Sequence, residues 1–415
     1  MSTSSTRGFW GLRDRPAVAW LVLAAAVAAA RPWVPKPTWL MVHLVLLGAL
    51  THAAMVWSTH FSAALLKTRP ELDDRHRQSQ RLLLLLVGVS LVVVGVPWEL
   101  WPVTVTGATA VAAAVVWHGI QLWRRLRAAL PGRFRITIRY YLVATAAVPV
   151  GATYGAILAR ELDDELTGRL IVAHTAIMGL GWLGMILTGT LVTLWPTMLR
   201  TRMDQRAEHF ARQALPWLVV AVVAVATGAT LGSRWATVTG LAMYAAALLW
   251  WGRALILPAR TAPPRHFSTR SVSVALGWLV ICLVMLAVLV LQAPTWEDVD
   301  HGYKPLATAL AIGFAAQLLV GALSYLVPSV LGGGPSVVRT GLAWLDRWST
   351  ARLVATNLGL LLVLLPVPDS VKVAGGVLVG AAVLTFVPLM GAGIRAAVTA
   401  REDLLTEVAQ RPADG

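Results

Sequence analysis

Histidines are the residues of this sequence whose chemistry and positions point most directly to a site. His43 lies early in an apolar segment over 38–62, and His174 lies early in another over 168–197. Neutral imidazole is a good ligand for iron, copper and zinc, and an apolar environment keeps it neutral. If both segments cross a membrane in the same direction, the two rings lie at one depth near the outer face. They are then predicted to share a metal ion or a haem, or else each only hydrogen-bonds to a helix backbone.

Two other histidines are candidates for cofactor or metal binding. His52 follows His43 by nine residues, which places it on the opposite face of the same helix. His52 therefore serves a separate cofactor site or a plain hydrogen bond. His301 stands at the outer entrance to a segment over 304–328, at a depth similar to that of the first pair, and is a candidate third metal ligand.

The segment 168–197 also carries small and soft residues at helical spacing. Small residues keep a helix face thin, which lets a second helix or a flat macrocycle approach the backbone. From the sequence, this face either packs against a second helix or lies against a cofactor. In the segment 304–328, an amide side chain on a similar face either orients a ligand or joins two helices. The residues of these two faces are Met178, Gly181, Gly184, Thr188 and Gln317.

Several chemistries lack their residues in this sequence. The apolar segments carry no Asp, Glu, Lys or Arg near their middles, so the residues needed for a carboxylate proton relay across the membrane are absent. The single cysteine, Cys282, excludes a disulfide framework or a thiolate cluster. Nucleotide-binding and hydrolase motifs are absent, and no inverted repeat or matched pair of broken segments indicates a transporter.

The elements that position these residues are predicted to be transmembrane helices. Hydrophobic residues make up 57% of the 415 and charged residues only 13%, so lipid must cover most of the surface. A bilayer core needs about 20 helical residues. The sequence therefore predicts an all-α polytopic bundle of about twelve transmembrane helices over residues 16–30, 38–62, 81–97, 103–123, 138–159, 168–197, 215–232, 236–257, 271–292, 304–328, 352–366 and 371–394.

The basic residues indicate the orientation of this bundle. The net charge of +15 comes from Lys and Arg in alternate short connections, so it indicates topology rather than nucleic-acid binding. The positive-inside rule places both termini in the cytoplasm, with a cytoplasmic segment over 1–15, the bundle over 16–396 and a cytoplasmic tail over 397–415. The first apolar segment also fits a cleavable signal sequence.

In layout, the twelve segments with a histidine early in the second and in the sixth resemble the main subunit of haem-copper oxidases. A closer resemblance is to the membrane region of actinobacterial proteins described as copper oxidases. The stretches that carry it are HLVLLGALTHAAMVWSTHFSAALL, GLGWLGMILTGTLVTLWPTMLRTRM and GYKPLATALAIGFAAQLLVGALSYLVPSVLGGGP. The resemblance implies a bacterial plasma membrane protein in which His43 would bind a haem and His174 a copper.

The departures from the oxidase pattern limit what the resemblance implies. The oxidases have further ligand histidines at the seventh and tenth segments, and 215–232 and 304–328 have none. We therefore expect no complete oxygen-reducing centre, and any enzymatic role would be that of an oxidoreductase component. The leading hypothesis is a degenerate relative that binds haem or copper near the outer face, for electron transfer or copper handling beside a cupredoxin-type or cytochrome partner. The alternatives are a cofactor-free membrane anchor or assembly scaffold, and a small-solute transporter.

Overall fold

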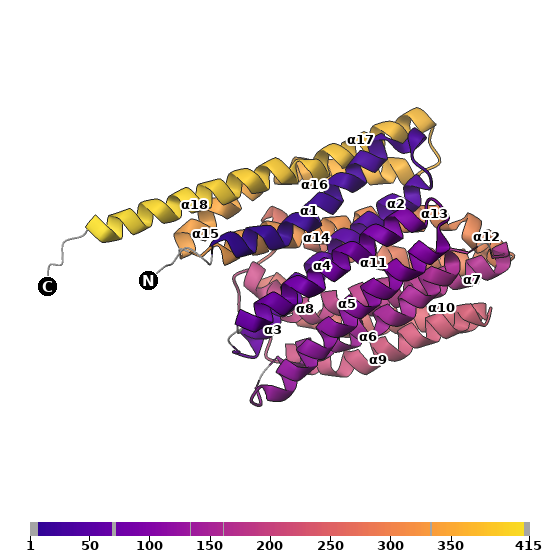
Figure 1. Cartoon of the computed structure of the whole chain (residues 1–415), viewed down its shortest axis with the longest axis horizontal. Helices are drawn as coiled ribbons and strands as arrows, with labels where there is room; N and C mark the ends of the chain where they lie inside the picture. Colours follow the sequence, from indigo (N-terminus) through magenta and orange to yellow (C-terminus); the bar gives the residue numbers. More distant parts are fainter. Residues whose placement is uncertain (1–6, 69–71, 133, 161, 333, 411–415) are drawn as a thin grey trace. The chain divides into compact units, whose positions relative to one another are not determined.

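The computed structural model of the protein describes residues 7–68, 72–132, 134–160, 162–332 and 334–410. Residues 1–6 and 411–415, which belong to the two predicted cytoplasmic segments, lie outside this range. The described residues form helices joined by short connections, and no strand occurs among them (Figure 1). The predicted all-α fold class is confirmed.

The helices of the first half of the chain are α1 (Arg7–Ala29), η1 (Arg31–Trp33), α2 (Pro37–His43), η2 (Leu44–Leu50), α3 (Thr51–Leu65), α4 (Leu72–Gly95), α5 (Trp101–Ala128), α6 (Arg135–Leu158), α7 (Asp164–Thr175), η3 (Ala176–Gly184) and α8 (Met185–Met198). Those of the second half are α9 (Ala207–Thr230), α10 (Arg234–Thr261), α11 (Phe267–Gln292), α12 (Trp296–His301), α13 (Tyr303–Thr308), η4 (Ala309–Ala316), α14 (Gln317–Val330), α15 (Pro335–Leu345), α16 (Ser349–Leu364), α17 (Asp369–Leu384) and α18 (Phe386–Gln410).

Among the described residues, 10 helices are long and apolar enough to cross a membrane. They suit a multi-pass protein in a lipid bilayer, because the polar groups of their backbones are satisfied within each helix. Two further predicted segments correspond to shorter apolar helices, Arg15–Ala29 and Ser349–Leu364. Helices α12 and α15 were not predicted, and α18 continues to Gln410, through most of the predicted cytoplasmic tail over 397–415.

The chain divides into two compact units. Unit 1 contains Met1–Pro263 and Val280–Ala307, and unit 2 contains Pro264–Leu279 and Thr308–Gly415. Helix α11 and the apolar stretch Tyr303–Val330 each contribute residues to both. The single transmembrane bundle over 16–396 stays a prediction.

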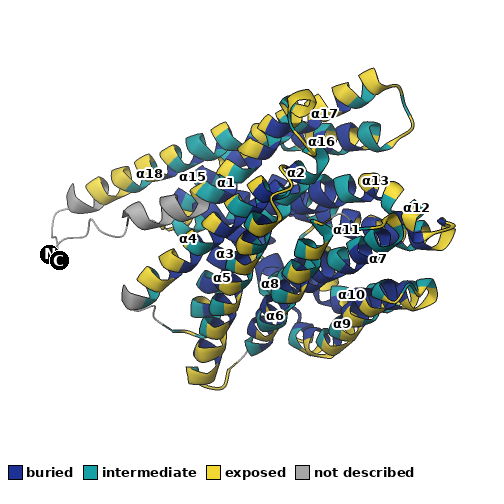
Figure 2. Cartoon of the chain, turned by 45° about the vertical axis from the view of Figure 1, so that its right-hand side comes forward, coloured by how far each residue is buried: buried dark blue, intermediate teal, exposed yellow. Residues whose placement is uncertain are grey.

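Within unit 1, consecutive helices pair closely at glycine positions. A methyl group at Gly88 on α4 would lie 2.8 Å from the backbone nitrogen of Val111 on α5. On α9, a methyl at Gly228 would lie 2.7 Å from the backbone nitrogen of Thr237 on α10. Glycine at such crossings brings backbones together, which is how helices associate where lipid removes the hydrophobic driving force. Figure 2 shows each pair with its inner faces buried and its outer faces exposed.

Unit 2 is held by the same kind of crossing and by an amide network. Gly359 on α16 and Gly375 on α17 each face the other's carbonyl oxygen. The Gln317 Nε2 atom donates to Asn357 Oδ1 at 3.1 Å, and Asn357 Nδ2 donates back to Gln317 Oε1 at 3.0 Å. Trp278 Nε1 donates to the same Asn357 oxygen at 2.7 Å. Gln317 therefore joins α14 to α16, and its amide is fully used in doing so.

Candidate metal site

Three membrane-length helices contain π-helical turns, and two of these turns follow the paired histidines directly. η2 begins after His43, η3 begins shortly after His174, and η4 lies within Tyr303–Val330. These three helices are also the most buried, at 67%, 72% and 78% of their apolar windows against at most 44% for the other seven. π-helical turns are rare and occur frequently at functional sites. The local backbone thus marks the two segments that carry His43 and His174.

The structure brings His43 and His174 together in unit 1. Their ring centroids lie 6.4 Å apart, with 27° between the ring planes. A metal between two imidazoles has bonds of about 2 Å to nitrogen and lies about 3 Å from each ring centre, so opposite ligands stand about 6 Å apart. The observed centroid separation of 6.4 Å is close to this distance.

Hydrogen bonds fix which nitrogen of each ring is available. His43 Nδ1 lies 2.9 Å from the Trp39 carbonyl oxygen, and His174 Nδ1 lies 3.0 Å from the Gly151 carbonyl oxygen. A carbonyl oxygen only accepts, so both Nδ1 atoms carry the proton and donate. Neutral rings then keep the lone pair on Nε2, which is the form in which metal-binding histidines are usually held.

Neighbouring side chains hold the two rings in place. The Trp39 ring stacks on His43 with centroids 3.9 Å apart and 19° between the planes. Gly155 on α6 makes room for the other ring, since a methyl group there would lie 3.1 Å from His174 Cε1. Both rings are half-buried, so each keeps an accessible side.

A side-chain hydrogen bond links the two π-helical segments. Trp182 Nε1, on η3, donates to Thr51 Oγ1 at 3.1 Å, and that hydroxyl donates to the Leu46 carbonyl of η2 at 2.9 Å. The second bond satisfies a carbonyl within the altered helical turn. The relative position of the two histidine-bearing segments is therefore held by buried polar contacts as well as by packing.

Next to His174, the hydroxyl of Thr175 forms a short hydrogen bond with the hydroxyl of Tyr303 on α13. Tyr303 is buried. This contact attaches α13 to the histidine-bearing helix, and the sequence analysis missed it because a tyrosine at a helix start fits an interfacial anchor equally well.

The predicted face of small residues on the histidine-bearing segment is occupied by other helices. A methyl group at Gly181 would lie 3.2 Å from Val222 on α9, and one at Gly184 would lie 2.5 Å from the Tyr244 hydroxyl on α10. Met178 packs on Gly151, and the Thr188 hydroxyl donates to the carbonyl of Gly184 at 2.8 Å. These residues make helix contacts rather than a surface open to a macrocycle.

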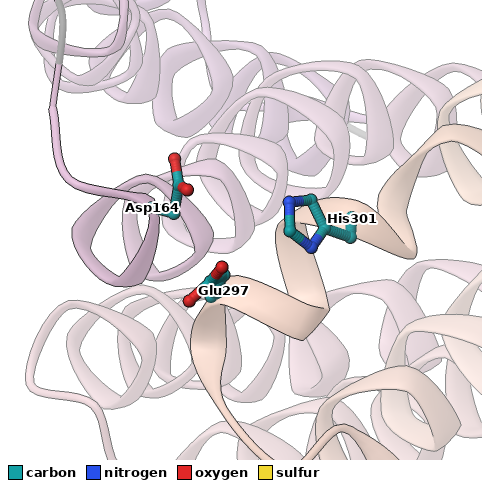
Figure 3. Close-up of side chains that lie close together, drawn as sticks. All are labelled: Asp164, Glu297 and His301. Carbon is teal, nitrogen blue, oxygen red and sulfur yellow. The ribbon is translucent and has the colours of Figure 1, made fainter.

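The two remaining histidine candidates lie in different surroundings. His52 is buried on α3. His301 groups with Asp164 and Glu297, and the ligand atoms of the three residues lie within 4.8 Å of one another. Figure 3 shows Asp164 on α7 facing Glu297 and His301 on α12. All three are exposed, so water competes for any ion there.

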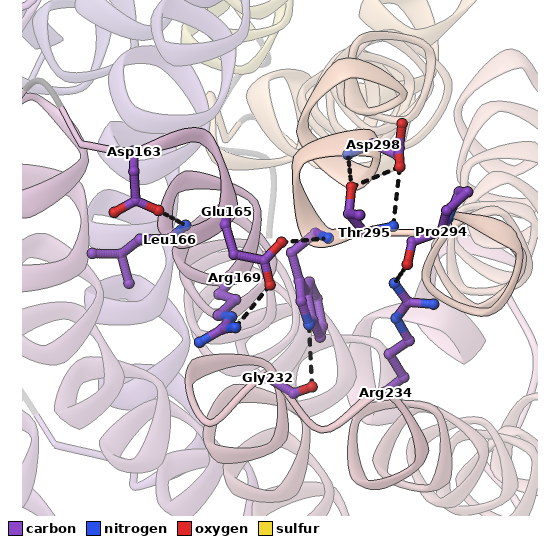
Figure 4. Close-up of polar contacts among 10 residues, drawn as sticks. Asp163, Glu165, Leu166, Arg169, Gly232, Arg234, Pro294, Thr295 and Asp298 are labelled. Carbon is purple, nitrogen blue, oxygen red and sulfur yellow. Dashed lines mark hydrogen bonds and ion pairs between the residues drawn. The ribbon is translucent and has the colours of Figure 1, made fainter.

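The short helix α12 is fastened to α7 by polar contacts, drawn in Figure 4. The Glu165 carboxylate accepts from the backbone nitrogen of Trp296 at 2.9 Å and from Arg169 at 2.7 Å. Trp296 Nε1 donates to the Gly232 carbonyl at 3.1 Å. Arg234 also donates to the carbonyl of Pro294. These contacts fix the connection that leads into Tyr303.

Two carboxyl groups of α12 differ in their surroundings. Hydrogen bonds from the Thr295 hydroxyl and backbone nitrogen hold the pKa of Asp298 below its ordinary value. Burial raises the pKa of Asp300 above its ordinary value. Asp298 therefore stays ionised at neutral pH and completes the capping box that begins α12.

A buried polar cluster at the other end of unit 1 was missed from sequence. Arg125 Nη2 lies 3.1 Å from Asp74 Oδ2, and Gln121 donates to Asp74 Oδ1 at 2.7 Å. The Ser58 hydroxyl lies 2.8 Å from His118 Nε2. These residues occur near the ends of apolar segments, where a charged side chain is normally exposed, and only the packing of α3, α4 and α5 buries them.

We expect Asp74→Asn to destabilise the protein by roughly 2 kcal/mol, because the Arg125 side chain is 9% exposed and would lose its charged partner. Thermal unfolding in detergent would measure this as a lower Tm. Glu99→Gln is the matched control, because its partner Lys36 is 46% exposed and a surface ion pair contributes about 0–1 kcal/mol. Equal effects of the two substitutions would contradict the prediction.

Comparison with known proteins assigns no family to this chain. It matches no protein-family model and no curated protein with which it was compared. The resemblance to the haem-copper oxidases stays a prediction.

Proposed function

We propose that this protein is a plasma membrane protein of about twelve spans, with both termini in the cytoplasm, that binds a transition metal near its outer face through His43 and His174. In this proposal the metal serves electron transfer or copper handling beside a cupredoxin-type or cytochrome partner. The ten membrane-length helices and the two shorter apolar helices support the spans. The basic connections support the orientation.

One observation carries the metal-binding part of the proposal. Two histidines that are far apart in sequence have ring centroids 6.4 Å apart, and each donates its Nδ1 proton to a backbone carbonyl. A histidine that only joined helices would need no second histidine opposite it. The pair of Nε2 lone pairs forms a donor set that suits copper, iron or zinc.

The surroundings of the pair favour a single ion over a haem. The sequence predicted a face open to a macrocycle at Gly181 and Gly184, and Val222 and Tyr244 cover that face. Copper needs only the donor atoms. We therefore propose copper first, and we keep haem iron as an outcome of the test.

The residues around the site have defined roles in this proposal. His43 and His174 would hold the metal through Nε2, and Trp39 and the Gly151 carbonyl would keep the rings oriented. A copper ion bound there would supply one-electron chemistry. Thr175 and Tyr303 would fix α13 beside the site.

The test is the metal content and optical spectrum of the purified protein, before and after addition of copper or haem. About one equivalent of bound copper without a Soret band would support the proposal that the histidine pair binds copper. A Soret band would assign the pair to haem. Protein that takes up neither copper nor haem after supplementation would overturn the proposal.

A cofactor-free membrane scaffold is the second candidate function. The packed glycine face of η3 and the fully used Gln317 amide favour it, because both regions are complete without a bound group. A scaffold would keep its fold and its partner association after both histidines are replaced. The two functions therefore predict different results for the same variants.

A further inference from the structure

An open groove lies between the start of α9 and the end of α10, both in unit 1. Its volume is about 550 Å³. Arg206 and Phe210 line one side, and Trp250, Arg253, Leu257 and Arg260 line the other. The residues on α10 recur at intervals of three or four, so they share one helix face. The groove is distinct from the histidine pair, which lies on other elements.

The lining carries an excess of positive charge. Three arginines, Arg206, Arg253 and Arg260, line the groove with a single carboxylate, that of Asp204, and the Arg206 Nε atom lies 3.7 Å from it. Asp204 is 5% exposed, and its carboxylate accepts a hydrogen bond from the backbone nitrogen of Arg206 at 2.8 Å, so Asp204 interacts with its own chain neighbour. Arg253 and Arg260 have no carboxylate opposite them among the lining residues. The groove therefore favours an anion.

Aromatic rings hold two of the guanidinium groups in place. The Arg253 guanidinium lies 4.3 Å from the centroid of the Trp250 ring, and that of Arg206 lies 5.5 Å from the Phe210 ring. A guanidinium group stacked on a ring keeps its N–H edge free to bind phosphate oxygens, often in pairs. The arrangement therefore suits a phosphate group better than an uncharged ligand.

Exposed apolar side chains border the same groove. Ile256 is 46% exposed and Leu257 is 51% exposed, on the helix face that carries Arg253 and Arg260. A phospholipid whose headgroup contacts the arginines would place its acyl chains over these side chains, and a soluble phosphate would make no contact with them. The ligand predicted by both features is an amphiphile with an anionic phosphate headgroup.

We propose that this groove binds an anionic phospholipid. The connection between α8 and α9 and the one after α10 belong to the basic set that the charge pattern places in the cytoplasm, so the lipid belongs to the cytoplasmic leaflet. Basic pockets between membrane helices on that side bind anionic headgroups. The proposal does not depend on metal binding at the histidine pair.

The test compares two double variants of the full chain in delipidated detergent solution. Arg253→Gln with Arg260→Gln removes two charges from the groove. Arg124→Gln with Arg127→Gln removes two exposed charges from the end of α5, where Arg127 lies 5.1 Å from the Trp123 ring and neither arginine lines this groove. Binding of phosphatidylglycerol and phosphatidylcholine is measured by native mass spectrometry, and inorganic phosphate is tested by thermal shift.

We expect wild-type protein to prefer phosphatidylglycerol, the groove variant to bind it about 30-fold more weakly, and the α5 variant to bind it as wild type does. Equal losses in both variants would overturn the proposal in favour of general surface charge. Equal binding of both lipids by the wild type would also overturn it. A thermal shift with phosphate alone that is as large as that with phosphatidylglycerol would replace the lipid with a soluble anion.

Discussion

Replacing His43 and His174 together with alanine is expected to abolish metal binding while the protein still folds. Each ring supplies one donor nitrogen, and a remaining single imidazole cannot hold an ion against water. Loss of groups that merely orient a ligand already costs 10–100-fold in affinity. We therefore expect each single variant to bind copper at least about 100-fold more weakly, and the double variant to bind none.

The fold should survive these substitutions because each histidine contributes little to it. Each ring donates one hydrogen bond to a carbonyl and is half-buried. Loss of one such bond costs about 1 kcal/mol. Gel filtration and thermal unfolding of the variants would establish that the protein is intact before its metal content is compared.

His76→Ala is the matched control for adventitious binding. His76 is exposed on α4 and interacts with the Gln80 side chain, so it offers a surface imidazole outside the site. Metal content that falls equally in all variants would point to surface binding. Metal content unchanged in the His43 and His174 variants would contradict the proposed site, and intact partner association in a metal-free wild type would favour the scaffold.

Gly168→Ala is expected to destabilise unit 1 strongly. A methyl group on Gly168 would overlap the carbonyl oxygen of Trp296 and lie 2.6 Å from its carbonyl carbon. Backbone atoms cannot move aside as a flexible side chain can, so α12 must separate from α7. Overpacking costs about 1–3 kcal/mol, and we expect a loss near the upper end of this range.

The separation would also break the contacts that hold α12. Glu165 would lose the backbone nitrogen of Trp296, and α13 with Tyr303 would shift relative to Thr175. A lower Tm is the primary readout of Gly168→Ala, and increased amide exchange over 296–303 is the local one.

Gly252→Ala is the control with the opposite expected sign. A methyl group at Gly252 on α10 meets nothing within 4 Å, and alanine favours a helix by about 1 kcal/mol over glycine. The same chemical change should therefore raise the Tm or leave it unchanged. A Gly168→Ala variant as stable as Gly252→Ala would show that the α7 and α12 backbones do not meet as described.

The helices were predictable because the signals are local. An apolar run of membrane length is a property of consecutive residues, and the predicted segments 38–62 and 168–197 fall within the helices Pro37–Leu65 and Asp164–Met198. The order of these segments then placed His43 and His174 at one depth. The exact number of spans and the sidedness stay predictions, because neither length nor composition fixes them.

Other features depend on contacts between residues that are distant in sequence. Apolar periodicity could not distinguish a glycine face that packs against α9 and α10 from one open to a cofactor. Nor could it show that Gln317 pairs with Asn357 or that Asp74 meets Arg125. The short helix α12 depends on Glu165, which lies far away in the chain.

The sequence by itself determined an all-helical protein with apolar helices of membrane length, and it predicted two histidines at matching depth, because hydropathy and charge are properties of consecutive residues. Only the tertiary structure decided that the centroids of the two rings lie 6.4 Å apart and that Nδ1 of each ring donates a hydrogen bond to a backbone carbonyl. The reason is physical: helix depth follows from the number of residues from the membrane surface. The direction in which a ring points follows from how helices rotate and pack against one another.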